Sequence, residues 1–228
     1  MILWVVLFVL IVAISFVLAA RSMRDFTEIP NKDEEYSLFL IRQPQKLNTK
    51  LLESIHNDLA HSKSIISFER LFKGNKSALV VFGPKKLLVT QQNLLDLLEL
   101  EDYTNINVEN ISAWEVGIKN NRSLDFPRDA QKILTNLPQL LENDQFWWQL
   151  VISSEFRVQI RTVVVSDNQT RRDSLTQALQ ALAPETIIKL PKAFSNTQLL
   201  DFYKIRSFTK DSKNPTLISE EILQMLSI

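Results

Sequence analysis

The side chains that could do chemistry in this chain are few and scattered. The sequence has no cysteine, two histidines and three glycines. It therefore excludes disulfides, thiolate zinc sites and cysteine nucleophiles, and argues against multi-histidine metal sites and glycine-rich phosphate loops. His56 and His61 are five residues apart, so on a helix they diverge and cannot bind a metal as an i, i+4 pair does. We expect no catalytic residue, no cofactor, no metal and no enzymatic activity.

Residues 82–86 (FGPKK) could bind phosphate, because they place a glycine and two lysines between a strand and the start of a helix. A Walker A loop, however, needs two glycines spaced around a cradle and then Lys-Ser/Thr, and this chain lacks that pattern. We favour a solvated turn. The carboxylates on or near strands have no spacing that suggests an acid–base pair; these are Glu69, Glu101, Asp102 and Glu115.

Basic side chains concentrate around residues 157–172. In an extended strand Arg157 and Arg161 fall on one face, and Arg171 and Arg172 begin the next helix. Together they could form a basic surface for an acidic partner or nucleic acid, although a solvated sheet face is the interpretation we favour. Lysine plus arginine and aspartate plus glutamate both number 26, so the net charge is zero and direct nucleic-acid binding is not expected.

An aromatic run marks the strand expected at residues 145–153. Phe146 and Trp148 alternate with Trp147, so we expect the first two to face the helices and Trp147 to face the other side of the sheet. A tryptophan there is either an interface anchor or part of the packing. The candidate partner-binding residues are thus Trp147, Arg157, Arg161, Arg171 and Arg172.

The first 20 residues carry no charged side chain. A helix of that length rises ~30 Å, the thickness of the hydrocarbon core of a bilayer. A cleaved signal peptide is the alternative, but no basic residue precedes the apolar run. Arg21 and Arg24 follow it, which predicts a single-pass protein of the cell membrane with its N-terminus outside and its remaining portion cytoplasmic.

The remaining chain alternates between strand and helix patterns, which predicts an α+β fold. Residues 21–35 are predicted to form a linker. Two successive segments each show the element order β-α-β-β-α-β of a ferredoxin-like unit, with the last strand of the second expected at 186–190 and a helix expected at 127–141. The predicted domains are a transmembrane helix (1–20), two tandem ferredoxin-like units (36–105 and 106–192) and a C-terminal helical extension (193–228).

Four stretches together resemble a known family. They are residues 101–104 (EDYT), 143–152 (NDQFWWQLVI), 158–165 (VQIRTVVV) followed by Arg171 and Arg172, and 217–222 (LISEEI). They are similar to the N-terminal, non-ATPase region of TraC-like or HerA/FtsK-related conjugation ATPases of type IV secretion systems. The sequence stops where that family's P-loop ATPase module would begin, so no nucleotide-binding residue carries over.

The resemblance implies a membrane-anchored, non-catalytic accessory or scaffold subunit of a type IV secretion or DNA-transfer complex. Its expected partners are the lipid bilayer and a separate P-loop ATPase or other complex subunits, and a homo-oligomer is compatible with this role. The alternative is a membrane-tethered sensory or regulatory module that binds a small ligand.

Overall fold

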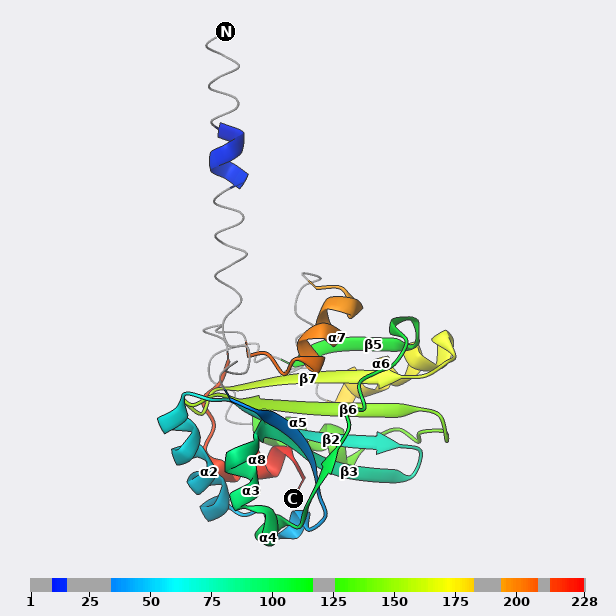
Figure 1. The fold of residues 1–228 in the computed structure, drawn as a ribbon. Helices are drawn as coiled ribbons and strands as arrows, with labels where there is room; N and C mark the ends of the chain where they lie inside the picture. Colours follow the sequence, from blue (N-terminus) through cyan, green and yellow to red (C-terminus); the bar gives the residue numbers. More distant parts are fainter. Residues whose placement is uncertain (1–9, 16–33, 117–125, 183–193, 209–213, 228) are drawn as a thin grey trace.

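The described chain folds around one antiparallel sheet. The computed structural model describes residues 10–15, 34–116, 126–182, 194–208 and 214–227. Their strands form a seven-stranded sheet in the order β4-β1-β3-β2-β6-β7-β5 (Figure 1). The strands are β1 Tyr36–Ile41, β2 Ile66–Lys73, β3 Lys76–Pro84, β4 Leu97–Leu100, β5 Ile111–Val116, β6 Gln145–Ile152 and β7 Val158–Val165.

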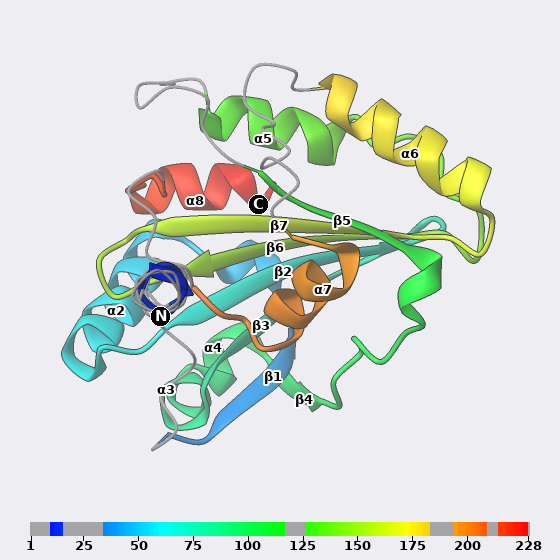
Figure 2. The same ribbon diagram turned by 90° about the horizontal axis from the view of Figure 1, so that it is seen from above.

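Helices cover both sides of the sheet, and Figure 2 shows α5, α6 and α8 on the side opposite α7. They are α2 Thr49–Ser62, α3 Lys85–Thr90, α4 Gln92–Leu95, α5 Phe126–Thr135, α6 Gln169–Leu182, α7 Asn196–Lys204 and α8 Ser219–Met225, with short 3-10 turns η1 Pro44–Lys46 and η2 Val108–Asn110. We call the side with Phe68, Trp148 and Ile160 the helical face, because these residues belong to one apolar core with residues of α2, α5, α6 and α8. The opposite side, the α7 face, carries Trp147 and packs against α7.

Local sequence signals account for the elements that build the helical face. The side chain of Asn48 accepts a hydrogen bond from the backbone N–H of Leu51 and so caps α2. Four apolar residues of α2 are then buried on one side of the helix, namely Leu51, Leu52, Ile55 and Leu59. Gly74 has a φ of +54° in the turn between β2 and β3, a conformation that glycine adopts without strain. Phe146 and Trp148 lie in the apolar core, as the alternation of β6 predicts.

The prediction of two tandem ferredoxin-like units is wrong. The two halves share one continuous sheet, because β2 pairs with β6 along its whole length, from Ile66 opposite Ile152 to Lys73 opposite Gln145. Pattern reasoning treats each half separately and cannot detect that two edge strands satisfy each other's backbone groups. The strand expected at 186–190 lies outside the described residues. The helix expected at 127–141 ends at Thr135, before Pro138, whose ring is incompatible with a continuing helix.

The predicted membrane span also requires correction. In the part of the chain that the structure describes, no helix is both long enough and apolar enough to cross a bilayer. Of the segment 1–20, only residues 10–15 belong to the described part of the chain, and the other residues of this segment lie outside it. On this finding the transmembrane helix, the single-pass topology and the cell-membrane localisation predicted above are wrong.

Candidate functional site

A row of polar side chains crosses the α7 face of the sheet. The strand register places Glu115 opposite Arg161, Arg161 opposite Gln149, and Gln149 opposite Glu69. We call these four residues the charged row. None of the four is more than 6% exposed. Four adjacent strands therefore place two carboxylates and a guanidinium in a position from which water is excluded.

Hydrogen bonds connect the charged row from end to end. Arg161 Nε donates to Glu115 Oε1 at 2.8 Å, and Arg161 Nη1 donates to Gln149 Oε1 at 3.4 Å. Gln149 Nε2 in turn donates to Glu69 Oε1 at 3.0 Å. Burial lowers the pKa of Arg161, and the charge of Glu115 works against that effect. Because a buried charge is tolerated only when it is paired, the row is a single electrostatic unit.

The segment 194–208, which contains α7 and which we call the α7 segment, covers the charged row. Gln149 Nε2 donates to the carbonyl of Tyr203 at 2.9 Å, and Arg161 Nη1 donates to the carbonyl of Ser207 at 2.6 Å. Carbonyls at the C-terminal end of a helix carry its partial negative charge. The sheet thus presents side-chain donors that match the end of a helix.

Arg206 attaches the end of the α7 segment to the sheet. Its Nε donates to Glu69 Oε1 at 3.1 Å and its Nη1 donates to Asp102 Oδ2 at 2.5 Å. Its guanidinium carbon lies 4.6 Å from the centroid of the Phe82 ring. Burial alone would lower the pKa of Arg206, but the charge of Glu69 and the bonds to Asp102 and Glu69 outweigh it, so the pKa is raised. Arg206 is therefore a cation at any accessible pH.

Two tyrosines complete the network around Glu69. Tyr103 OH donates to Glu69 Oε2 at 2.5 Å, and the hydroxyls of Tyr103 and Tyr203 are 2.8 Å apart. Burial and then the negative charge of Glu69 raise the pKa of both phenols well above the ordinary value.

These raised pKa values predict a loss of stability in alkali. An unfolded tyrosine has a pKa of about 10, so the folded chain holds these protons more tightly, and the stability they contribute is complete below that pH and is lost above it. In a spectrophotometric titration we expect tyrosinate from Tyr103 and Tyr203 to appear only as the chain unfolds. The double variant Tyr103→Phe/Tyr203→Phe should lose less stability in alkali. Ionisation of both phenols at an ordinary pKa in the folded chain would contradict this prediction.

The structure brings together two of the five partner-binding residues predicted from sequence. Trp147 is 1% exposed, and its ring centroid lies 5.6 Å from that of Tyr203. Arg161 belongs to the charged row on the same face. The other three lie elsewhere: Arg157 pairs with Glu155, Arg171 pairs with Asp144, and Arg172 donates to the carbonyl of Ser166. The five residues therefore do not form one continuous basic surface.

Sequence reasoning missed the remaining members of this site. Neither the spacing of Glu69 and Glu115 nor the position of Gln149 in its strand indicates a buried network. Arg206 and Glu69 are 137 positions apart, so no local pattern connects them. The one usable signal was a polar side chain at alternate positions of strands that are otherwise apolar, which indicates a buried polar layer or an exposed face.

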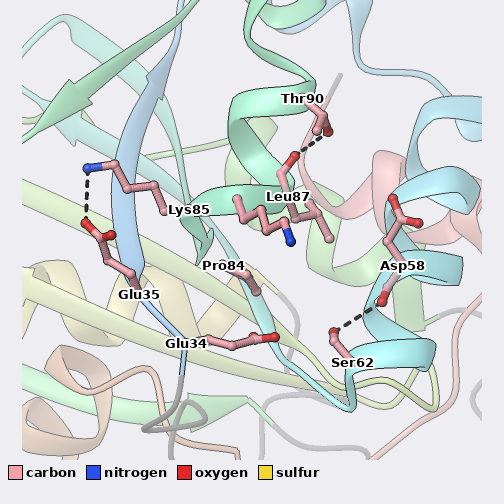
Figure 3. A pocket seen from close by; sticks show the side chains of 9 residues that line it. Glu34, Glu35, Asp58, Ser62, Pro84, Lys85, Leu87 and Thr90 are labelled. Atoms are coloured by element: carbon pink, nitrogen blue, oxygen red, sulfur yellow. Dashed lines mark hydrogen bonds and ion pairs between the residues drawn. The ribbon is translucent and has the colours of Figure 1, made fainter.

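A separate hollow lies where β3 meets α3 (Figure 3). It has a volume of about 730 Å³ and is lined by Glu34, Glu35, Asp58, Ser62, Pro84, Lys85, Lys86, Leu87 and Thr90. Lys85 Nζ lies 3.2 Å from Glu35 and 3.0 Å from Glu99, and its hydrogen bonds to these carboxylates raise its pKa. The carboxylates around Lys85 make this turn a poor phosphate site.

Within the described ranges, no group of three histidine, aspartate or glutamate side chains could hold a metal ion. The charged row is closed, and its hydrogen bonds join one part of the chain to another. Comparisons with known protein families and with curated proteins give no match for this chain.

Proposed function

We propose that this chain is a non-catalytic accessory subunit that docks a separate protein. The partner class suggested by the resemblance is the P-loop ATPase of a type IV secretion or DNA-transfer complex. The observation that supports docking is a difference between the two edges of the sheet.

One edge of the sheet is occupied and the other is open. On β5 the side chain of Asn196 accepts from the backbone N–H of Ala113 at 3.2 Å and donates to the carbonyl of Ile111 at 3.3 Å. The amide thus takes the place of a neighbouring strand. At the other end of the sheet, β4 pairs with β1 alone among the described strands. An unpaired edge can add a strand from another protein.

Exposed apolar side chains occur on the open edge strand and on the two helices that precede it in the chain. Leu98 on β4 is 42% exposed, Leu94 on α4 is 49% exposed, and Val89 on α3 is 46% exposed. Apolar side chains beside a free edge give a bound strand specificity as well as backbone hydrogen bonds. We therefore assign β4 as the docking edge for an extended segment with apolar residues at alternate positions.

The test is purification of the intact chain from its native cells after gentle crosslinking. We expect a stoichiometric P-loop ATPase to accompany the wild type. Leu98→Asp should reduce its recovery about tenfold, a loss of ~1.4 kcal/mol in binding free energy. The matched control is Leu141→Asp, because Leu141 is 59% exposed and precedes β6. Equal recovery with Leu98→Asp, or a wild type without any stoichiometric ATPase, would contradict the proposal.

A ligand-binding regulatory module is the second candidate, and the hollow beside α3 favours it. Its volume of about 730 Å³ lies within the range of ~300–1,000 Å³ typical of small-molecule sites. Its lining includes the carboxylates of Glu34 and Asp58 and the ammonium group of Lys86, a mixture that suits a ligand with both an amino and an acid group. This function requires no protein partner, so the same purification separates the two candidates.

A further inference from the structure

The open edge of β4 presents backbone groups at alternate residues. In an antiparallel pair, every second residue of a strand bonds to the neighbouring strand, and the residues between them direct their N–H and C=O groups to the other side. The backbone N–H of Arg42, just after β1, donates to the carbonyl of Asp96, just before β4, at 3.4 Å. Leu98, two positions further on, therefore bonds to β1, and the backbone groups of Leu97 and Glu99 point to the open edge.

The two faces of this edge differ in chemistry. Glu99 lies opposite Phe39, which belongs to the apolar core of the helical face, so the side chain of Glu99 lies on that face. Leu98 lies on the opposite face and is 42% exposed. A strand added to β4 would thus place one row of its side chains beside Leu98 and the alternate row beside Glu99.

Negative charge is in excess around Glu99. Its Oε1 lies 3.0 Å from Lys85 Nζ, which also lies 3.2 Å from Glu35 Oε1 (Figure 3). Hydrogen bonds from Lys85 and then Ser37 lower the pKa of Glu99, so this carboxyl is ionised at neutral pH. Glu101 follows β4, is exposed, and takes part in no ion pair within the described ranges. Three carboxylates therefore share the single ammonium group of Lys85.

We infer that the segment bound at β4 is an antiparallel strand in which apolar and basic side chains alternate. Its apolar residues lie beside Leu98, and its lysines or arginines lie beside Glu99, where they offset the excess of negative charge. All pairs of the described sheet are antiparallel. An acidic strand would meet a like charge at Glu99, so this residue selects by repulsion as well as by attraction. The inference rests on the proposed docking at β4 and adds the chemistry of the segment that docks.

A change of charge in the peptide and in the chain tests this inference. The probe is a short fluorescein-labelled peptide of alternating valine and lysine, and its counterpart carries glutamate at each lysine. In fluorescence anisotropy at low salt, we expect the full-length chain to bind the lysine peptide about tenfold more tightly than the glutamate peptide. Glu99→Lys should remove this preference. The matched control is Glu155→Lys, the same change of charge at a 65% exposed side chain after β6, and it should keep the preference.

Methylation of the peptide backbone distinguishes a paired strand from a peptide that is held by charge alone. In an antiparallel strand, the lysines opposite Glu99 direct their N–H groups at β4, and the valines direct theirs away. N-methyl groups on the lysines should therefore abolish binding, and the same number of N-methyl groups on valines should not. Equal binding of the two methylated peptides, or a lysine preference that survives Glu99→Lys, would overturn the inference.

These outcomes are separate from that of the ATPase purification. If an ATPase accompanies the wild type but the chain does not discriminate between the lysine and glutamate peptides, this inference is overturned and the docking function stands. If the chain discriminates between the peptides but no ATPase is recovered, the chemistry of the β4 edge is supported and the proposed partner is contradicted.

Discussion

Replacing Arg206 with alanine should lower the free energy of unfolding by about 3 kcal/mol, the largest effect expected in the network around Glu69. The side chains of Arg206 and Glu69 are 2% and 0% exposed, so the variant leaves a carboxylate buried without its cation. The loss falls at the lower end of the usual ~3–5 kcal/mol, because Ser67, Gln149 and Tyr103 still donate to Glu69. Urea denaturation followed by circular dichroism measures it.

Two further variants separate charge burial from simple loss of contact. Glu69→Met/Arg206→Met replaces the pair with apolar side chains and should recover most of the stability, because it leaves no buried charge without a partner. Arg157→Ala breaks an exposed pair with Glu155 and should cost less than ~1 kcal/mol. A loss for Arg206→Ala no greater than that of Arg157→Ala would contradict the prediction that the variant leaves the Glu69 carboxylate buried without a compensating charge.

The α7 segment should also loosen in acid. Burial acts to raise the pKa of Asp102, but the hydrogen bond and charge of Arg206, with bonds from Thr104, outweigh it and lower the pKa. A carboxyl with a lowered folded pKa contributes stability above its unfolded pKa of about 3.9, and that stability is lost as the pH falls further. Acid thus weakens the ion pair between Asp102 and Arg206, and Asp102 lies at the exposed side of the network.

Local patterns were sufficient for the strands that pair through a tight turn. The strand expected at 145–153 corresponds to β6, and the extended strand expected around Arg157 and Arg161 corresponds to β7. Alternating aromatic and β-branched residues determine both the extended backbone and its two faces. The pairing of β2 with β6 was not accessible in this way. It joins segments about 80 positions apart, as Glu69 and Gln149 illustrate, and nothing in either strand specifies the other.

The candidate site was only partly accessible for the same reason. Trp147 and Arg161 were identified because each is an unusual residue on a strand, and they do lie on the same face. Their burial depends on the α7 segment, which the sequence presents as an ordinary amphipathic helix. Arg171 and Arg172 looked like members of a basic surface, yet each binds an acceptor nearby, since an arginine at a helix start commonly finds local carbonyls and carboxylates.

Trp148 should give the largest loss on the helical face. Its side chain is 0% exposed within the apolar core, so Trp148→Ala removes a large buried volume and should cost about 3–5 kcal/mol. Its indole Nε1 has no hydrogen-bond partner among the described residues. Trp148→Phe would therefore relieve an unsatisfied donor, worth ~1–3 kcal/mol, which offsets much of the volume it removes.

Trp147 is the matched comparison, because its Nε1 donates to Gln145 Oε1 at 3.1 Å. Trp147→Phe loses that bond as well as volume, so it should be more destabilising than Trp148→Phe by about 1 kcal/mol. Urea denaturation of Trp148→Ala, Trp148→Phe and Trp147→Phe measures the difference. If Trp148→Phe proves as costly as Trp148→Ala, the indole must have a partner in solution, and a buried water is the candidate, since an interior donor without one is expensive to keep.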